Sequence, residues 1–203
     1  MTGSSAVGRS GKRLYDGVLN MPRLADWLSF EILSPGECVE LLAELRGTAG
    51  DAATVYGLAP RGEVHALARR TTQLCPRPAI RDSVFSTLQD LRGRLSEAFK
   101  VPIASCEEPQ FLRYQEGDYF VAHQDGNTPS IRDDSRHRRV SLIAFLNDPA
   151  DYSGGDLLFH AGPVERVPAP AARGTALAFR SELTHEVTPL IAGERYTIVT
   201  WYR

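Results

Sequence analysis

The chain is short of cysteine, of long apolar runs and of net charge, and each shortage excludes a class of protein. Its 203 residues include only three cysteines, an odd and widely spaced set that fits neither a disulfide framework nor a zinc site. No apolar stretch approaches the roughly 20 residues that a membrane-spanning helix requires. The 23 basic and 25 acidic residues leave a net charge of -2, which gives no general attraction to nucleic acid or anionic membranes. We therefore expect neither nucleic acid nor a membrane as a partner, and the cysteine usage favours a cytoplasmic location.

The chain divides into a polar N-terminal stretch and one expected domain. Residues 1–20 begin with a small, polar and basic run that lacks the apolar core of a signal peptide, so we expect a flexible tail there. The hydrophobic content of 42% is enough to bury a sizeable core in a chain of this length. We expect residues 21–203 to form a single domain.

Two helices are predicted in the first half of the chain. Ser34-Pro35-Gly36-Glu37 combines an N-cap serine, a proline at the first helical position and a capping-box glutamate, and apolar residues at helical spacing follow up to Gly47. Apolar residues also recur on one face from Ile80 to Phe99, which predicts a second helix over about 79–99 with Gly93 as its weak point. We expect both apolar stripes to pack against one face of a sheet.

Short strands are predicted from residue 105 onward. The segment 140–146 is apolar on both faces, as a central strand would be, and Gly154-Gly155 and Gly174 separate its neighbours. The sequence therefore predicts a mainly β fold with flanking helices. Strand density alone permits several kinds of sandwich or barrel.

The tripeptide His123-Gln124-Asp125 indicates a metal site. It ends a segment of strand composition, in which residues two apart point to the same face, so His123 and Asp125 can project together. His185 begins a later strand-like segment and can supply a third ligand. Two histidines and one carboxylate bind non-haem iron(II) and leave about three coordination positions open. An isolated H-x-D tripeptide is more often a surface histidine beside a solvated aspartate, so the surrounding motifs decide the interpretation.

Those motifs form an ordered series over the second half of the chain. They are Arg113-Tyr114 with Gly117, His123-Gln124-Asp125, Phe145-Leu146-Asn147, Gly154-Gly155-Asp156, Phe179, His185-Glu186-Val187-Thr188-Pro189, Gly193-Glu194-Arg195 and Trp201. The series resembles the catalytic domain of the prolyl 4-hydroxylase-like iron(II)/2-oxoglutarate dioxygenases, with its motif region at 105–203. The resemblance implies a double-stranded β-helix, the cupin-like jelly roll.

The resemblance also implies the roles of individual residues. His123, Asp125 and His185 would bind Fe(II), and Arg195 would pair with the C5 carboxylate of 2-oxoglutarate. Tyr114 would hydrogen-bond this co-substrate, or else be a half-buried tyrosine of the barrel. Arg195 heads a strand-like segment, so its guanidinium can enter the barrel and form a bidentate pair with a carboxylate.

The reaction implied is hydroxylation of an unactivated C–H bond with O2, which releases succinate and CO2, with ascorbate as a candidate reductant. Asp125 favours hydroxylation over halogenation, because related halogenases lack this carboxylate. The primary substrate would be a prolyl residue of a peptide or protein, or a free amino acid. An alternative substrate is a natural-product intermediate. An alternative function is that of a non-catalytic sensor that binds metal and 2-oxoglutarate.

Two segments are candidates for substrate contact. The glycine- and alanine-rich segment 47–66 is a candidate lid, and it leads into a predicted edge strand over 65–74 that contains Arg70. The charged segment 126–139 follows Asp125 and contains Arg138 and Arg139. Such a charged segment usually forms a solvated loop. The alternative is that it contacts the substrate, because it lies beside the metal motif.

Overall fold

The computed structural model describes residues 27–54, 65, 67–161 and 164–203, and its strands form two large antiparallel sheets. The major sheet has the order β1 (Trp27–Glu31), β11 (Thr175–Arg180), β7 (Val140–Phe145), β14 (Arg195–Tyr202), β5 (Gln110–Tyr114), β4 (Thr72–Leu74), β2 (Gly50–Ala52). The minor sheet has the order β10 (Arg166–Pro168), β9 (Leu157–His160), β12 (His185–Val187), β6 (Tyr119–His123), β3 (Arg69–Arg70). A hairpin of β8 (Tyr152–Gly154) and β13 (Leu190–Gly193) adds a short ribbon.

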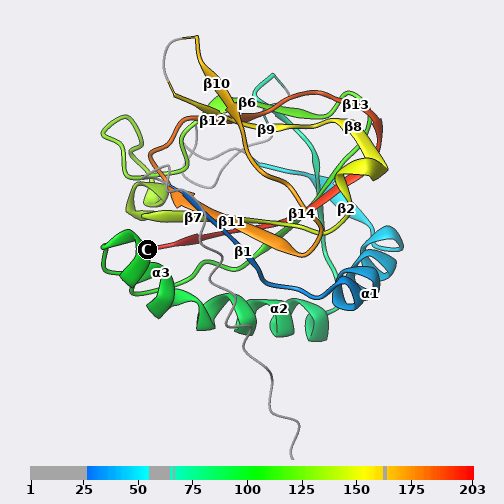
Figure 1. Cartoon of the computed structure of the whole chain (residues 1–203), viewed down its shortest axis with the longest axis horizontal. Helices are drawn as coiled ribbons and strands as arrows, with labels where there is room; N and C mark the ends of the chain where they lie inside the picture. Colours follow the sequence, from blue (N-terminus) through cyan, green and yellow to red (C-terminus); the bar gives the residue numbers. More distant parts are fainter. Residues whose placement is uncertain (1–26, 55–64, 66, 162–163) are drawn as a thin grey trace, which may run out of the picture.

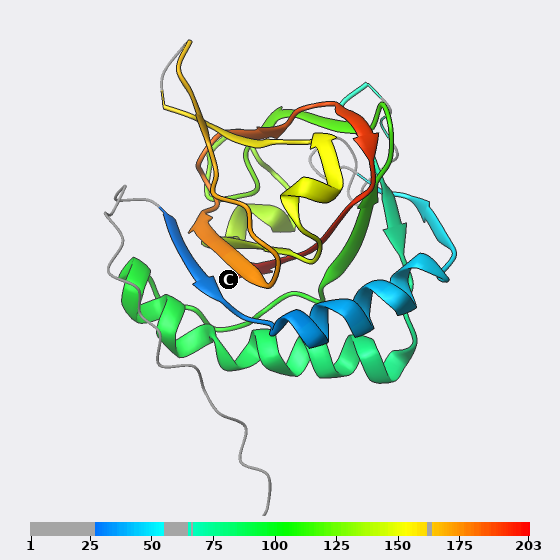
Figure 2. The ribbon, with the colours of Figure 1, turned by 45° about the vertical axis from the view of Figure 1, so that its right-hand side comes forward.

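Three helices lie along the outer face of the major sheet (Figures 1 and 2). They are α1 (Pro35–Arg46), α2 (Pro78–Asp90) and α3 (Arg92–Phe99), and two 3-10 turns, η1 (Asp134–His137) and η2 (Pro149–Asp151), lie in loops. The capping box predicted for α1 is present, because the Ser34 hydroxyl accepts from the Glu37 N–H and the Glu37 carboxylate accepts from the Ser34 N–H. The helix ends at Arg46, before Gly47, as predicted.

The helix predicted over 79–99 is present as two helices that meet at Leu91. The Leu91 N–H bonds to the Leu88 carbonyl three residues back, which tightens the turn between α2 and α3. Gly93 follows two residues later, where its backbone freedom makes the helix weak. The apolar stripe is nevertheless continuous, because Leu88, Leu91 and Leu95 all belong to one core cluster.

The two faces of the major sheet bury two separate cores. Along β14, Tyr196, Ile198 and Tyr202 pack toward the helices, whereas Val199 and Trp201 pack between the two sheets. This follows from the alternation of side chains along a strand. The neighbouring strand β7 is buried at every position, which confirms the central strand predicted at 140–146. The molecule is therefore mainly β with flanking helices, and its two facing antiparallel sheets form the jelly roll expected from the sequence.

The predicted edge strand over 65–74 is divided between the two sheets. β3 lies at the edge of the minor sheet, whereas β4 lies inside the major sheet between β5 and β2. Thr71 joins them, and its hydroxyl donates to the Arg113 carbonyl of β5. Residues 55–64 and 66 of the predicted lid, and the predicted tail at 1–20, lie outside the described residues. Within the described ranges, every helix is too short or too polar to cross a bilayer.

Gly174 joins three elements and should not tolerate a side chain. Its φ is +82°, and an added Cβ would lie 2.3 Å from the Leu33 carbonyl oxygen. Its own carbonyl accepts from the Ile32 and Leu33 N–H groups that lead into α1. We expect Gly174→Ala to lower the free energy of unfolding by about 1–3 kcal/mol, the cost of a backbone held in a sparsely populated region. Urea denaturation followed by circular dichroism measures this change.

Gly93 provides the matched control for this substitution. It lies in α3 with no atom within 4 Å of an added Cβ. Gly93→Ala should raise the free energy of unfolding by roughly 0.5–1 kcal/mol, because alanine loses less backbone entropy in a helix. Equal stabilities of the two variants would show that Gly174 does not constrain the junction of β1, α1 and β11.

Candidate functional site

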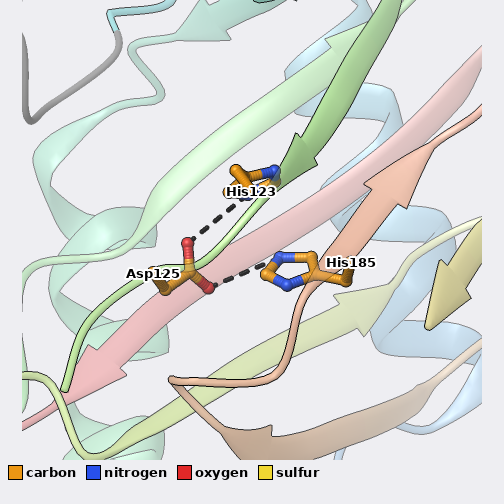
Figure 3. Close-up of side chains that lie close together, drawn as sticks. All are labelled: His123, Asp125 and His185. Atoms are coloured by element: carbon orange, nitrogen blue, oxygen red, sulfur yellow. Dashed lines mark ion pairs between the residues drawn. The ribbon is translucent and has the colours of Figure 1, made fainter. Parts of the chain in front are cut away.

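Neighbouring strands of the minor sheet bring three metal-ligand side chains together (Figure 3). β12 pairs with β6 so that His185 lies opposite His123. Asp125 follows the end of β6, where its N–H bonds to the Ser181 carbonyl in the turn before β12. One ligand atom from each of His123, Asp125 and His185 can be chosen so that all three lie within 4.8 Å of one another. We call this group the His-Asp-His cluster.

The hydrogen bonds of the two imidazoles direct the free nitrogen of each ring toward Asp125. His123 Nδ1 lies 2.8 Å from the Val121 carbonyl oxygen, and His185 Nδ1 lies 2.9 Å from that of Leu183. A carbonyl accepts only, so Nδ1 carries a proton in both rings, and in the neutral form of each ring Nε2 keeps its lone pair. The Nε2 atoms lie 3.6 and 3.5 Å from the two Asp125 carboxylate oxygens. An ion between these atoms would receive two neutral nitrogens and one carboxylate oxygen, the ligand set that suits iron(II).

Burial and neighbouring charges favour the protonation states that metal binding requires. Burial lowers the pKa of His185 to about 4, repulsion from His123 adds to this effect, and Asp125 opposes it. Burial acts to raise the pKa of Asp125, but His185 and His123 outweigh it and hold that pKa well below its usual range. His185 is therefore neutral and Asp125 is ionised at neutral pH.

Arg195 supplies a buried cation with unfilled hydrogen-bonding capacity. It begins β14 opposite Tyr114 of β5, and its guanidinium carbon lies 5.1 Å from the centre of the Tyr114 ring. The side chain is 2% exposed, and its Nε and Nη2 atoms have no hydrogen-bond partner among the described residues. Buried polar groups without partners cost free energy, so this arrangement suits a site that receives an anion. Arg195 lines a cavity of about 100 Å³ together with Phe145, Tyr152 and Leu157.

A second cavity, of about 90 Å³, opens beside the His-Asp-His cluster, and we call it the mouth cavity. The described residues that line it are Thr54, Arg69, Gln110, Phe120, His123, Gln124, Asp125, Ile131, Ser135, Arg138 and Trp201. Arg195 is not among them. His123 and Asp125 of the His-Asp-His cluster therefore line one cavity, and the buried Arg195 lines another.

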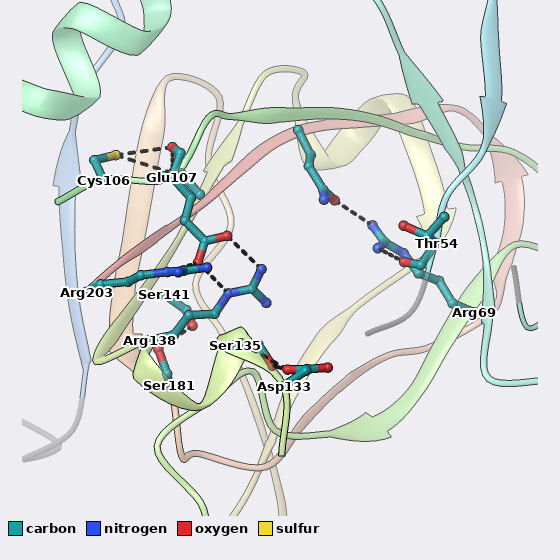
Figure 4. A network of polar contacts seen from close by, with 12 residues as sticks. Thr54, Arg69, Cys106, Glu107, Asp133, Ser135, Arg138, Ser141, Ser181 and Arg203 are labelled. Atoms are coloured by element: carbon teal, nitrogen blue, oxygen red, sulfur yellow. Dashed lines mark hydrogen bonds and ion pairs between the residues drawn. The ribbon is translucent and has the colours of Figure 1, made fainter. Parts of the chain in front are cut away.

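Of the three arginines predicted to contact substrate, only Arg138 lines the mouth cavity. Its Nε and Nη2 donate to the two Glu107 carboxylate oxygens at 2.8 and 2.7 Å (Figure 4). Its guanidinium carbon lies 3.8 Å from the centre of the Trp201 ring. It is thus buried and held in place rather than solvated. Arg139 contacts Asn127, and neither it nor Arg70 lines this cavity.

Arg69 lines the mouth cavity and its neighbour Arg70 does not. Arg69 lies over the Phe120 ring at 4.9 Å, whereas the Arg70 side chain is 62% exposed and pairs with Asp118. A β-bulge explains the difference. Val187 pairs with Phe120 and His185 with His123, so β6 has one extra residue there and Phe120 stacks on the His123 ring. Strict alternation of side chains along β6 does not place Phe120 on the same face as His123. No local feature of the sequence therefore singled out Arg69.

Removing one donor from the His-Asp-His cluster should abolish metal binding without unfolding the protein. Loss of an outer-shell partner weakens metal binding by about 10- to 100-fold. We expect His185→Ala, which removes a direct donor, to weaken Fe(II) or Co(II) binding by more than this. His160→Gln is the control, because His160 lies on β9 and pairs with Glu186, outside the cluster. Titration with Co(II), followed by absorption, measures both affinities. Unchanged affinity in His185→Ala would exclude His185 as a ligand.

Known proteins resemble this chain in sequence. Residues 109–203 match the family model described as the 2OG-Fe(II) oxygenase superfamily. A PKHD-type hydroxylase of Paracoccus denitrificans is 31% identical over 176 residues, which are 84% of this chain and 74% of that protein. A PKHD-type hydroxylase of Paraburkholderia xenovorans is 30% identical over 81% of this chain and 73% of its own length.

Solved structures share the fold. A Pseudomonas putida prolyl-4-hydroxylase has a TM-score of 0.68 at 21% identity, over 88% of this chain and 92% of that one. A Trichoplax adhaerens prolyl hydroxylase also has a TM-score of 0.68, at 18% identity, over 87% and 83%. The sequence matches over most of the chain, together with the shared fold, show that the chain belongs to the 2OG-Fe(II) oxygenase superfamily and is an enzyme related to the PKHD-type hydroxylases.

Proposed function

We propose that this enzyme hydroxylates a prolyl residue of a peptide or protein, or a free amino acid, with Fe(II) at the His-Asp-His cluster and 2-oxoglutarate at Arg195. The observation that carries the proposal is the coexistence of two incomplete sites. One is a set of three metal donors, and the other is a buried guanidinium whose Nε and Nη2 have no partner in the described protein. A dicarboxylate that binds the metal at one end and Arg195 at the other would complete both.

Iron(II), 2-oxoglutarate and O2 together supply the oxidising chemistry, in which one oxygen atom enters succinate, the other enters a substrate C–H bond, and CO2 leaves. The chain's own residues hold and orient these groups. Asp125 retains the carboxylate donor and so supports hydroxylation rather than halogenation. Arg195 would bind the distal carboxylate of 2-oxoglutarate through its Nε–Nη2 edge, and Tyr114 would lie beside that carboxylate.

The mouth cavity is the proposed place for the primary substrate. It adjoins His123 and Asp125, and Arg138 stacked on Trp201 forms one of its walls. A substrate there would approach the metal without displacing Arg195, which lines the other cavity. The Trichoplax adhaerens neighbour was solved with a peptide fragment of hypoxia inducible factor. That likeness supports a peptide substrate for this chain, and a free amino acid is the other candidate.

Loss of the Arg195 guanidinium should affect 2-oxoglutarate far more than the metal. We expect Arg195→Ala to weaken 2-oxoglutarate binding by about 2–5 kcal/mol, the cost of removing one partner of a buried charge pair. Arg195→Lys should recover part of this loss, since it restores the charge without the bidentate geometry. The apparent KM for 2-oxoglutarate, with Fe(II) affinity measured in parallel, tests both variants. An unchanged KM in Arg195→Ala would exclude Arg195 from this role.

The substrate proposal predicts a mass gain of one oxygen atom coupled to succinate. Free L-proline, prolyl peptides and other free amino acids should be incubated with Fe(II), 2-oxoglutarate and O2, with and without ascorbate, and analysed by mass spectrometry. We expect a proline-containing compound to gain one oxygen with succinate formed in equal amount. Turnover of 2-oxoglutarate without oxygen transfer to any of these compounds would contradict the substrate assignment while leaving the dioxygenase chemistry intact.

A further inference from the structure

The mouth cavity contains two buried hydrogen-bond donors that the described protein leaves unpaired. They are Nε of Arg69 and Nε1 of Trp201, and both side chains are 6% exposed. A buried donor without an acceptor costs free energy, and such groups in a native structure require an explanation. Two unpaired donors in one cavity favour a ligand that is rich in acceptor oxygens.

The geometry of Arg69 leaves one edge of its guanidinium open. Nη1 is held at 3.0 Å by the Thr54 carbonyl, and the ring of Phe120 lies against the guanidinium face. On the other edge, Nε has no hydrogen-bond partner among the described residues, and Nη2 makes a long contact of 3.5 Å with the Gln110 side chain. The Tyr114 side chain also interacts with Arg69. The paired N–H groups of that edge match the two oxygens of a carboxylate. Arg69 is thus fixed in position while the edge that binds carboxylates stays available.

The charges around the cavity favour an anion. The hydrogen-bond partners found for Arg69 are neutral, and Asp125, the one acid among the described lining residues, belongs to the His-Asp-His cluster. Glu107 lies behind Arg138, and its carboxylate is shared, because it also accepts from Arg203 at 2.7 Å (Figure 4). Glu107 thus carries one negative charge against the two positive charges of Arg138 and Arg203, and Arg69 adds a positive charge that Asp125 partly offsets. The Asp133 carboxylate accepts from the Ser135 N–H and hydroxyl at the start of η1.

We propose that the mouth cavity binds a carboxylate carried by the primary substrate, and that Arg69 determines this specificity. The inference rests on the proposed function, which it narrows to acidic substrates. The carboxylate can be the α-carboxylate of a free amino acid, or an acidic side chain or C-terminus of a peptide. These sources share one chemistry, and pairs of compounds that differ by a single charge distinguish them.

The first test compares such pairs in coupled turnover. The pairs are L-proline with L-prolinamide, a capped peptide Pro-Glu with Pro-Gln, and a prolyl peptide with a free or an amidated C-terminus. For at least one pair, the acid should have a kcat/KM about 10- to 100-fold above that of its amide, the range expected for bonds to a charged group. In Arg69→Gln this ratio should fall to near one.

Two variants separate carboxylate binding from a structural role of Arg69. Arg69→Lys keeps the charge without the two-pronged edge and should recover part of the acid preference. Arg70→Gln removes the neighbouring cation, which is exposed and outside the cavity, and should leave the preference unaltered. An acid preference that persists in Arg69→Gln, or amides that react as well as acids in every pair of the wild-type enzyme, would overturn the proposal.

The second test measures binding without turnover. The chain has two tryptophans, so a Trp27→Phe background leaves Trp201 as the single fluorescent reporter in the mouth cavity. N-acetylproline and N-acetylprolinamide should be titrated anaerobically into protein loaded with Fe(II) and saturating 2-oxoglutarate. The acid alone should change the emission at low concentration, and Arg69→Gln should remove this response. Equal responses to both compounds would refute the carboxylate site, whereas an absence of hydroxylation in the first test would count against the proposed function.

Discussion

The pairing of β12 with β6 is the interaction on which the active site depends. It places His185 opposite His123, although a long stretch of chain separates the two in sequence. The same pairing brings the turn before β12 against Asp125, whose N–H bonds to Ser181. Three ligand side chains are therefore positioned by main-chain hydrogen bonds, which are rigid, rather than by contacts among flexible side chains. The Nδ1 bonds of both imidazoles to nearby carbonyls complete this arrangement.

A good part of the fold could be predicted from local sequence. The capping box of α1, the apolar stripe over α2 and α3 and the doubly buried strand β7 each rest on residues close together in the chain. Spacing and order also identified the three side chains that the structure gathers into the His-Asp-His cluster. The interruption at Leu91 was not predicted, because a single tightened turn hardly changes the spacing of apolar residues.

The mouth cavity was harder to predict, since its side chains are set by contacts between distant segments. Arg138 lies in a charged stretch typical of solvated loops, but Glu107 and Trp201, which hold it, come from opposite ends of the motif region. Arg69 and Arg70 are adjacent residues of the same type, so the sequence alone does not tell which of them faces the cavity. Only the extra residue in β6 decides which of them shares a face with His123, and register shifts of this kind leave no local mark in a sequence.

The unequal covering of the two sheets has a consequence for how the protein responds to its ligands. Helices back the major sheet, whereas no described helix covers the outer face of the minor sheet (Figure 2). The minor sheet carries the proposed metal ligands His123 and His185. A metal that joins these strands stabilises only conformations in which they are paired. Metal binding at the His-Asp-His cluster would therefore act as a local cross-link. Amide hydrogen exchange should slow in β6 and β12 when the metal binds, while the helix-backed strands β7 and β14 remain protected with or without it.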